Sequence, residues 1–447
     1  MNLRRWTWAL LMALMVFSVG CQQDDEVRAP EMMDTGLENN LVNLNSGESV
    51  DLIPDFDCSG SAAYKWILNG ETVSNQPVYE FHADEPGLYD MRFEVANELG
   101  SRQLNYSLRV AGKYSSGVFI VNEGWFGHEP GSVHFWDRSS SQLQTNIFQN
   151  ENPGKDLGIT TQYACVQNGK FYLVSKGYNT NKGCLVVANA ATLKEEGRVL
   201  LPNGQCRAFV ALDDQVGFLS TGGLGTANGS GIYQVNLKNY TLGAALNGVG
   251  NQEVGNMMIA SGKLFALKAQ ELLIYDIGSR SVYRTISLPA NAGGMVKDKD
   301  GMIWVGAGAS LLKVNPSNCS HEFISLSGAS VNASYGWAWN AGSLTYSKTN
   351  HSLYFVNGGG WAPKSVGRFN IATRRAEDLF SIDPDYQIYG AGTYVDPVAN
   401  KLYVTALKGF GQDAKYNRLY VYSLDGYKER VLNYGHFYFS ALCISAD

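Results

Sequence analysis

One apolar strand pattern recurs throughout the part of the chain that follows residue 113. Its copies read "GVFIVN", "KFYLVS", "QVGFLS", "KLFALK", "MIWVGA", "SLYFVN" and "KLYVTA", and they start near residues 117, 170, 215, 263, 302, 352 and 401. After most copies, a second apolar run ends in an Asx turn, as in "LIYDIGSR". A repeat of this length with four strands per unit is typical of a β-propeller. Residues 113–447 are therefore predicted to form a seven-bladed β-propeller.

The two ends of the repeat region indicate how the ring closes. The innermost strand of each unit recurs, but it is missing before the first unit and reappears at the C-terminus as "FSALCISAD". A C-terminal strand that completes the first blade leaves no free edge in the ring. The predicted fold class is therefore all-β, with a propeller closed by its C-terminal strand.

The N-terminus carries the pattern of an exported lipoprotein. Arg4 and Arg5 precede "WTWALLMALMVF", an apolar run that is too short to span a bilayer and is typical of a signal peptide. The run ends in "SVGC", which resembles the lipobox of bacterial lipoproteins and implies a signal peptide over residues 1–20 and lipidation of Cys21. The acidic "QQDDE" that follows resembles the surface-export signal of some Gram-negative lipoproteins. We expect a lipid anchor that holds the protein on the outer membrane, exposed at the cell surface; an ordinary secretory signal is the alternative.

Two segments lie between the predicted signal peptide and the repeats. Residues 21–38 are polar, contain proline and are predicted to be a flexible tether. Residues 39–112 hold short, evenly spaced strands, a pattern typical of an antiparallel sandwich. Within them, "YKWILNGE" and "GLYDMRFEVANELG" resemble PKD-type, immunoglobulin-like domains. The resemblance implies a spacer or a docking module and assigns no binding residue.

Composition and motifs exclude several classes of function. The net charge is −6 and the chain after the signal peptide has no basic cluster, so we expect no nucleic-acid partner. The sequence has no phosphate-binding loop and no Gly-x-Ser-x-Gly, His-Glu-x-x-His or Cys-x-x-Cys motif. Of the six histidines, only His128 and His436 fall on the predicted long loops of the propeller, and no carboxylate cluster accompanies them. We therefore predict that the protein is not an enzyme and has neither a metal site nor a covalently bound cofactor.

The longest predicted loops fall on one face of the propeller and carry many aromatic residues. The connections between the second and third strands of a blade, and between successive blades, lie on the same face of a propeller. They include "NEGWFGHEPG", "KGYNTNKG", "NGGGWAPKSVG" and "LKGFGQDAKYN". Loops on a rigid scaffold often carry binding residues, whereas packing in the central channel is the alternative role for such rings. The predicted ligand-binding residues are Trp125, Phe126, His128, Tyr178, Trp337, Trp339, Trp361, Tyr389, Phe410 and His436.

Three longer segments carry a family resemblance. "GVFIVNEGWFGHEPGSVHFWD", "YGAGTYVDPVANKLYVTA" and "NYGHFYFSALCI" resemble the YncE-like propeller lipoproteins of gut bacteria, over roughly residues 113–447. That group includes surface lipoproteins of the BtuG type, which bind cobalamin and cap an outer-membrane vitamin B12 transporter. The resemblance implies a corrinoid ligand and an outer-membrane transporter as a partner. It implies no individual contact residues.

Three functions remain open for the predicted long-loop face. The first is binding of a large, partly apolar small molecule, with cobalamin or a related corrinoid as the leading candidate. The second is binding of a glycan or of the cell wall, because aromatic rings also stack on sugars. The third is interaction with a protein partner, in which the PKD-like domain would share the binding.

Overall fold

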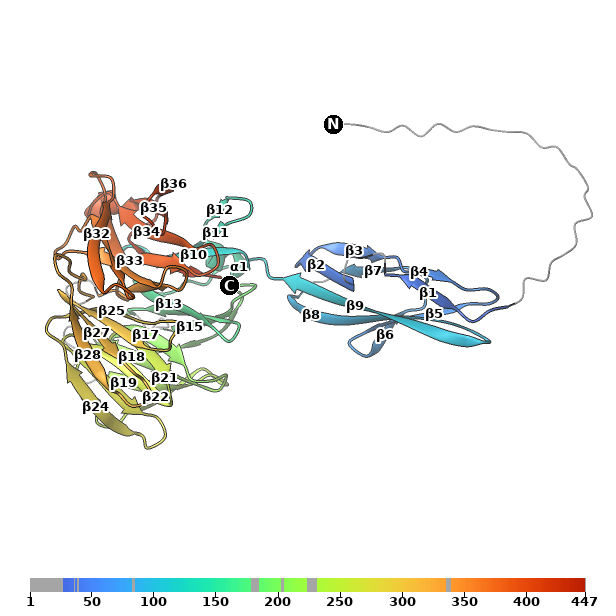
Figure 1. The fold of residues 1–447 in the computed structure, drawn as a ribbon, viewed down its shortest axis with the longest axis horizontal. Helices are drawn as coiled ribbons and strands as arrows, with labels where there is room; N and C mark the ends of the chain where they lie inside the picture. The colour runs from blue at the N-terminus through green and yellow to red at the C-terminus, as the bar shows by residue number, and fades with distance from the viewer. Residues whose placement is uncertain are drawn as a thin grey trace, which may run out of the picture. The chain divides into compact units, whose positions relative to one another are not determined.

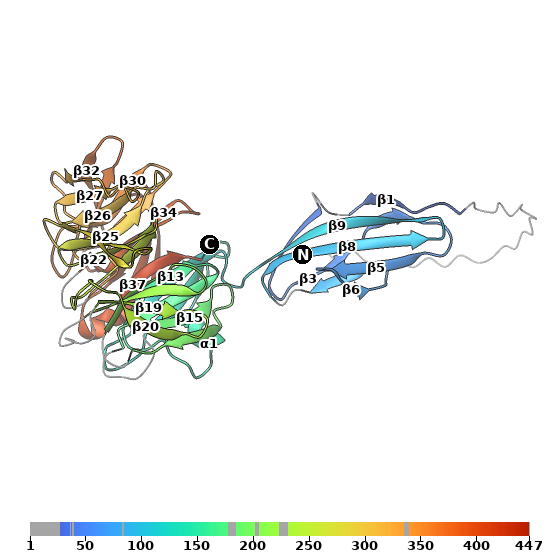
Figure 2. The ribbon, with the colours of Figure 1, turned by 90° about the horizontal axis from the view of Figure 1, so that it is seen from below.

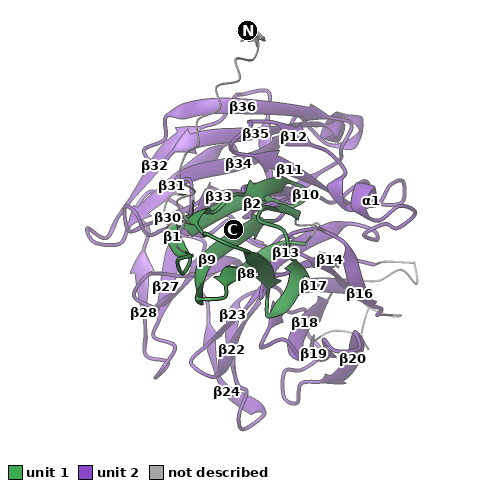
Figure 3. Cartoon of the chain, turned by 90° about the vertical axis from the view of Figure 1, so that its right-hand side faces the viewer, with its two compact units in different colours: residues 1–111 green, residues 112–447 purple. Residues whose placement is uncertain are grey.

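The chain divides into two compact units, Met1–Ala111 and Gly112–Asp447 (Figure 3). The computed structural model describes residues 27–446, except 36, 38–39, 83–84, 178–184, 202–204, 223–230 and 335–338. The predicted signal peptide and Cys21 therefore lie outside the described residues. Each unit has its own hydrophobic core, so each is described by itself.

Unit 1 is an immunoglobulin-like sandwich, as predicted, but it is not wholly antiparallel, because residues 41–45 pair in parallel with residues 107–111 (Figures 1 and 2). Its largest sheet has the strand order β2-β9-β8-β5-β6, with bounds Leu41–Asn45, Gly100–Ala111, Gly87–Asn97, Ala63–Leu68 and Glu71–Ser74. Two small sheets pair β1 (Glu31–Asp34) with β4 (Asp55–Asp57), and β3 (Ser49–Leu52) with β7 (Tyr79–His82). Trp66 and Phe93 from the large sheet and Phe81 from β7 share one buried core. Alternation over residues 91–95 of β8 and 106–110 of β9 places every second side chain in that core, and the side chains between them are at least partly exposed.

The predicted tether is wrong at its C-terminal end. Strand β1 pairs antiparallel with β4, with Glu31 opposite Asp57 and Met32 opposite Phe56. The polar composition of residues 21–38 suggested a flexible segment, but strand pairing uses backbone groups, which every residue type except proline supplies in full. The folded part of unit 1 therefore begins before residue 39.

Unit 2 is a seven-bladed β-propeller, as predicted; its described residues form seven four-stranded sheets. Blade 1 joins β37 (Ser440–Ser445) to β10 (Gly117–Asn122), β11 (Ser132–Asp137) and β12 (Leu143–Gln144). Blade 2 comprises β13 (Thr161–Gln167), β14 (Lys170–Ser175), β15 (Leu185–Asn189) and β16 (Glu195–Val199). Blade 3 comprises β17 (Gln205–Ala211), β18 (Val216–Gly222), β19 (Gly231–Asn236) and β20 (Thr241–Ala245). Helix α1 (Ile147–Glu151) lies between blades 1 and 2 in the chain.

The other four blades follow the same order along the chain. Blade 4 comprises β21 (Met257–Ala260), β22 (Lys263–Lys268), β23 (Glu271–Asp276) and β24 (Ser281–Ser287). Blade 5 comprises β25 (Ala292–Lys297), β26 (Ile303–Ala307), β27 (Ser310–Val314) and β28 (His321–Ser325). Blade 6 comprises β29 (Thr345–Ser347), β30 (Ser352–Asn357), β31 (Ser365–Asn370) and β32 (Arg375–Ser381). Blade 7 comprises β33 (Gln387–Asp396), β34 (Lys401–Leu407), β35 (Tyr416–Ser423) and β36 (Lys428–Gly435), with the short helix η2 (Gly411–Lys415) before β35.

The second strand of each blade is apolar at nearly every position because both of its faces are covered. In β22, Leu264 and Ala266 pack with residues of blade 3, whereas Phe265 and Leu267 pack with residues of blade 5. Successive side chains of a strand point to opposite faces of the sheet, so each blade packs against two neighbours. Figure 3 shows the consequence: the outermost strands, such as β24 and β36, lie at the periphery of the ring.

The C-terminal strand closes the ring, as predicted. Strand β37 pairs antiparallel with β10, with Ile120 opposite Cys443 and Val121 opposite Leu442. An ion pair joins the same blade to blade 7: Nε of Arg138 donates to Oδ2 of the fully buried Asp396 at 2.8 Å. The Arg138 guanidinium also donates to the Ser445 hydroxyl at 2.8 Å. Strand pairing and a buried charge pair therefore both hold the chain end in place.

Candidate functional site

Several long connections lie at the face at which the second and third strands of each blade are joined. They link β10 to β11 (residues 123–131), β30 to β31 (358–364) and β34 to β35 (408–415). The connections β28–β29 (326–344) and β36–β37 (436–439) reach the same face, because in antiparallel blades alternate turns lie at the same end. We call this the long-loop face.

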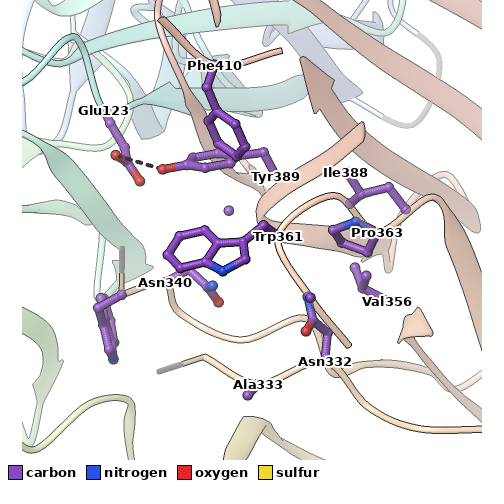
Figure 4. A pocket seen from close by; sticks show the side chains of 13 residues that line it. Glu123, Asn332, Ala333, Asn340, Val356, Trp361, Pro363, Ile388, Tyr389 and Phe410 are labelled. Atoms are coloured by element: carbon purple, nitrogen blue, oxygen red, sulfur yellow. Dashed lines mark hydrogen bonds between the residues drawn. The ribbon is translucent and has the colours of Figure 1, made fainter. Parts of the chain in front are cut away.

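A pocket of about 240 Å³ opens on the long-loop face (Figure 4). We call it the loop-face pocket. Its lining comes from blades 1, 6 and 7 and from the connection that precedes blade 6: Glu123, Asn332, Ala333, Trp339, Asn340, Val356, Gly360, Trp361, Pro363, Ile388, Tyr389, Gly390 and Phe410. The fold therefore gathers residues that are far apart in the sequence around one hollow.

Four predicted ligand-binding residues line this pocket: Trp339, Trp361, Tyr389 and Phe410. The side chains of Trp361 and Phe410 remain 64% and 47% exposed, and Figure 4 shows the Trp361 ring in the middle of the view, below Phe410 and Tyr389. Trp339 is only 2% exposed, so it forms part of the wall. Exposed rings at a pocket mouth supply contact area that the core does not use.

Glu123 is the charged residue among those that line the pocket. It is 5% exposed, and burial raises the pKa of its carboxyl from 4.5 to about 8, although the positive charges of Lys176 and Arg207 oppose this rise. The Tyr389 hydroxyl donates a hydrogen bond of 3.4 Å to Oε2 of Glu123, as the dashed line in Figure 4 marks. Burial and the nearby Glu123 also raise the pKa of Tyr389, which therefore stays protonated as the donor.

Arg207 links the neighbourhood of Glu123 to the inner strands of the propeller. Its Nε donates to Oε1 of Glu253 at 2.8 Å, and its guanidinium also donates to Gln205 at 3.1 Å and to Gln162 at 3.5 Å. The guanidinium carbon lies 5.7 Å from the centre of the Trp339 ring. The positive charge of Arg207 is therefore paired with Glu253, and its guanidinium lies close to the Trp339 ring in the pocket wall.

Trp125, Phe126 and His128 belong to the same β10–β11 connection as Glu123, but they are not among the residues that line the loop-face pocket. The Trp125 ring stacks between those of His128 and Tyr438, with ring centres 4.0 Å and 4.8 Å away. The backbone N–H of Glu123 donates to the carbonyl oxygen of Phe439 at 2.8 Å, which ties the loop to the β36–β37 connection. Phe126 is exposed, and the Lys176 ammonium lies 5.7 Å from its ring centre.

Gly124 is a position in this loop at which glycine is required. Gly124 has φ of +78°, and a Cβ atom there would lie 2.3 Å from the carbonyl oxygen of Pro130. Because both the backbone conformation and the space exclude a side chain, Gly124 permits the tight return that stacks Trp125 on His128. The loop therefore has a defined conformation that holds the Trp125 and His128 rings together.

The remaining predicted residues are Tyr178, Trp337 and His436. Tyr178 and Trp337 lie outside the described residues, so their predicted roles stay predictions. His436 is exposed in the β36–β37 connection and is not among the residues that line the pocket. Its φ of +70° places it at a turn, which accounts for its position between β36 and β37.

Sequence reasoning missed several residues of the pocket, above all Glu123, Asn332 and Asn340. A signal was present for Glu123, because a carboxylate directly follows the fully buried strand β10. No comparable signal marks Asn332 and Asn340, which lie in a long connection rich in small and polar residues. Their role depends on how the ring places this connection beside blade 7.

Comparison with known families assigns both units. Residues 116–445 match the family described as Domain of unknown function (DUF5074). The chain belongs to this family. Upstream of the DUF5074 propeller, residues 32–97 match a PKD-like domain. A search of curated proteins finds no match.

Solved structures that are similar to this chain include proteins of Bacteroides thetaiotaomicron. A quinonprotein alcohol dehydrogenase-like protein from this organism superposes with a TM-score of 0.61 at 18% identity, over 94% of this chain and 99% of that chain. The extracellular domain of a hybrid two-component system from the same organism gives a TM-score of 0.41 at 18% identity, over 62% of this chain and 33% of that chain. At this identity, the first likeness supports the fold of the DUF5074 propeller and its PKD-like neighbour alone.

The described residues contain neither a candidate metal cluster nor a candidate membrane-spanning helix. No cluster of three or more histidine, cysteine, aspartate or glutamate side chains in the described part of the chain is arranged to hold a metal ion. Among the same residues, no helix has both the length and the apolar character needed to cross a membrane.

Proposed function

We propose that the DUF5074 propeller binds a large, partly apolar small molecule across its long-loop face, with cobalamin or a related corrinoid as the leading candidate. The observation that carries this proposal is the pair of exposed rings, Trp361 and Phe410, at a pocket that a buried carboxyl also lines. In this proposal the protein is lipidated at Cys21 on the outer-membrane surface and delivers its ligand to a transporter.

The size of the pocket limits how such a ligand binds. Its volume of about 240 Å³ is below the roughly 300–1,000 Å³ of a pocket that encloses a drug-sized ligand. A corrinoid would therefore lie over the mouth against Trp361 and Phe410 and insert one side group. Covering about 100 Å² of each ring contributes roughly 2.5 kcal/mol per ring at ~25 cal/mol per Å².

The row of rings next to the pocket enlarges the available surface. From Phe410 it runs through Tyr389, Phe439 and Tyr438 to Trp125, with ring centres 6.2, 5.3, 6.4 and 4.8 Å apart. A broad, flat ligand can contact several of these rings together. This row favours a ligand larger than the pocket itself.

A glycan is the second candidate ligand. The amide side chains of Asn332 and Asn340 line the pocket with Trp361. Sugars present one apolar face to an aromatic ring and direct hydroxyl groups sideways to planar amides. The combination of amides and an exposed indole therefore also supports a saccharide site.

The proposal is tested by titrating purified protein with cyanocobalamin in a calorimeter. Trp361→Ala combined with Phe410→Ala is expected to weaken binding by about two to four powers of ten, since the loss of both rings removes roughly 5 kcal/mol of contact at ~1.4 kcal/mol per decade. Its matched control is Tyr427→Ala, which removes a ring that is 74% exposed in the turn between β35 and β36, at the opposite face. The control is expected to keep full affinity.

The outcomes separate the two candidate ligands. If cyanocobalamin does not bind, the corrinoid proposal is wrong, and an oligosaccharide that binds in its place establishes the second candidate. If cyanocobalamin binds equally to the wild type and to the double variant, the ligand lies elsewhere on the protein.

A further inference from the structure

Unit 1 begins close to the predicted lipidation site. Five residues, 22–26, separate Cys21 from Val27, the first residue that the structure describes. A chain of this length spans at most about 20 Å in any conformation, since each residue adds no more than roughly 3.5 Å. The proposed function places acyl chains on Cys21. The part of unit 1 around Val27 therefore lies within about 20 Å of the lipid-bearing residue.

The residues that follow Val27 are held beside the turn that joins β8 to β9. Nδ2 of Asn97 donates to the carbonyl oxygen of Arg28 at 2.5 Å. A Cβ atom at Gly100 would lie 3.5 Å from the Cβ atom of Ala29. Asn97 and Gly100 pair with each other on either side of the β8–β9 turn. The chain thus enters unit 1 at the end that carries this turn, and we call this the entry end.

The β8–β9 turn presents an apolar side chain at the entry end. Leu99, one of its two residues, is 57% exposed. A single exposed leucine is ordinary on a protein surface, so exposure alone identifies no partner. Leu99, however, lies at the end that the short tether keeps near the lipid, and transfer of an apolar side chain from water to hydrocarbon is favourable. The exposed charges beside it, Arg28 and Glu98, are of opposite sign and favour no charged partner.

We infer that the entry end of unit 1 is a membrane-contact surface, at which Leu99 enters the lipid bilayer beside the anchor. This inference rests on the proposed function for the acyl chains on Cys21, and it goes beyond that function by assigning a lipid surface as the partner of unit 1. Strand β9 runs away from the entry end for 12 residues, about 36 Å at roughly 3.3 Å per residue (Figure 2). It ends at Ala111, where the chain leaves unit 1. Unit 1 is then a spacer that stands on the bilayer at one end and continues into the next unit from the other.

The test is hydrogen exchange of the lipidated protein on a membrane. The full-length protein, produced with its own signal peptide, is reconstituted into vesicles of phosphatidylethanolamine and phosphatidylglycerol. The reference is the chain from residue 22 onward, produced without the signal peptide and measured in solution. Residues 97–100 are expected to exchange at least about threefold more slowly on the vesicles than in solution. Residues 46–48, in the turn beside Ala111 at the other end of unit 1, are expected to exchange alike in both samples.

Two leucines of the same strand region provide matched variants. Leu99→Asp places a charge at the entry end and is expected to reduce the slowing of residues 97–100 to less than about 1.5-fold. Leu88→Asp makes the same change at a side chain that is 81% exposed and lies opposite Arg109, near the other end of unit 1, and it is expected to keep the slowing. Each variant is compared with its own soluble form, so a change in the stability of the turn cancels. Equal slowing in both variants, or its loss in both, would overturn the assignment to Leu99.

The length of the tether is tested by insertion. About 20 glycine and serine residues between Glu26 and Val27 add roughly 25 Å of average reach and are expected to abolish the slowing at residues 97–100. The matched control places the same insert between Ala111 and Gly112, after unit 1, and is expected to leave the slowing intact. Slowing that survives the first insertion would show that the short tether does not hold this end on the bilayer, and the inference would be wrong.

Mass spectrometry of the N-terminal peptide separates this inference from the proposed function. If Cys21 carries no acyl chain, the proposed anchor is wrong, and the membrane contact is wrong with it. If Cys21 is acylated and residues 97–100 exchange alike on vesicles and in solution, the membrane contact is wrong and the anchor stands. Binding of cyanocobalamin is measured on the soluble form, so neither outcome alters that part of the proposed function.

Discussion

Blades 4 and 7 have the same four-stranded architecture but differ at the long-loop face. In blade 4, strands β22 and β23 are joined by residues 269–270, whereas in blade 7, strands β34 and β35 are joined by residues 408–415. The strands themselves are equally buried: Phe265 of blade 4 and Val404 of blade 7 are both fully inaccessible to solvent. The comparison teaches that the strand repeat builds the ring, while the length of a few connections decides where a site forms.

The same division separates two buried titratable groups of blade 1. His134 lies in strand β11, where its ring centre is 4.0 Å from that of Phe437, and its Nδ1 accepts a hydrogen bond of 3.1 Å from the backbone N–H of Asn146. Glu123 lies in the loop that follows β10 and faces the pocket. His134 therefore belongs to the strand scaffold and Glu123 to the candidate site. Variants of the strands and of the loops can test whether scaffold and site are separate.

The largest expected effect comes from removing the strand that completes the scaffold. Deletion of residues 440–447 is expected to unfold or aggregate the propeller, because β10 loses its partner β37 and Arg138 loses Ser445. The measurement is thermal unfolding followed by circular dichroism, together with the monomer yield from size-exclusion chromatography. Unit 1, residues 27–111, is expected to keep its own unfolding transition, since it has a separate core. An unchanged propeller transition in the deletion variant would contradict the closure.

The next effect compares two tryptophans, one in a strand and one in a loop. Trp136 in β11 is buried and packs edge-on against Tyr403, with ring centres 5.7 Å apart. Trp136→Ala is expected to lower the free energy of unfolding by about 3–5 kcal/mol, as a core cavity does. Trp361→Ala, at an exposed loop position, is expected to change it by less than about 0.5 kcal/mol. Denaturant unfolding measures both, and equal losses would erase the distinction between scaffold and site.

The smallest net effect is that of pH, because it has opposite signs at the two buried groups. Burial lowers the pKa of His134 from 6.5 to about 3, so between these values the unfolded chain binds a proton that the folded chain does not, and stability rises with pH. Burial raises the pKa of Glu123 from 4.5 to about 8, so over that range the folded chain holds the extra proton, and stability falls as pH rises. Each group changes the free energy of unfolding by at most about 1.4 kcal/mol per pH unit. Because the signs are opposite, the two contributions oppose each other between pH 4.5 and 6.5, where the two ranges overlap.

Single variants are expected to separate these contributions. In His134→Asn, which retains an acceptor for the Asn146 N–H, the gain in stability between pH 3 and 6.5 is expected to disappear relative to the wild type. In Glu123→Gln, the loss between pH 4.5 and 8 is expected to disappear instead. The measurement is the difference in unfolding free energy between each variant and the wild type across this pH range. A difference that does not depend on pH would show that the group titrates alike in the folded and unfolded chains.

Much of the scaffold could be predicted from the sequence because its cause is local and periodic. A strand covered by neighbouring blades on both sides must be apolar throughout, so "KLFALK" and its relatives mark every blade. The absence of a first inner strand and the surplus C-terminal one indicated the closure that the pairing of β10 with β37 confirms. The start of unit 1 was less predictable, since β1 is held by backbone pairing and its composition is polar.

The candidate site could be predicted only in part, because aromatic residues in long loops mark a face but not a pocket. Trp361 and Phe410 could be found in this way, because both lie in long connections outside the strands, and both rings are exposed. The sequence alone did not separate Trp339, which is buried in the wall, from Trp125, which stacks beside the pocket. Closure of the ring decides which residues line the pocket, because it brings blade 1 beside blade 7 and places Glu123 next to Tyr389. The distance between residues that are far apart in the chain is set by closure of the ring, and so is the desolvation that raises the pKa of Glu123.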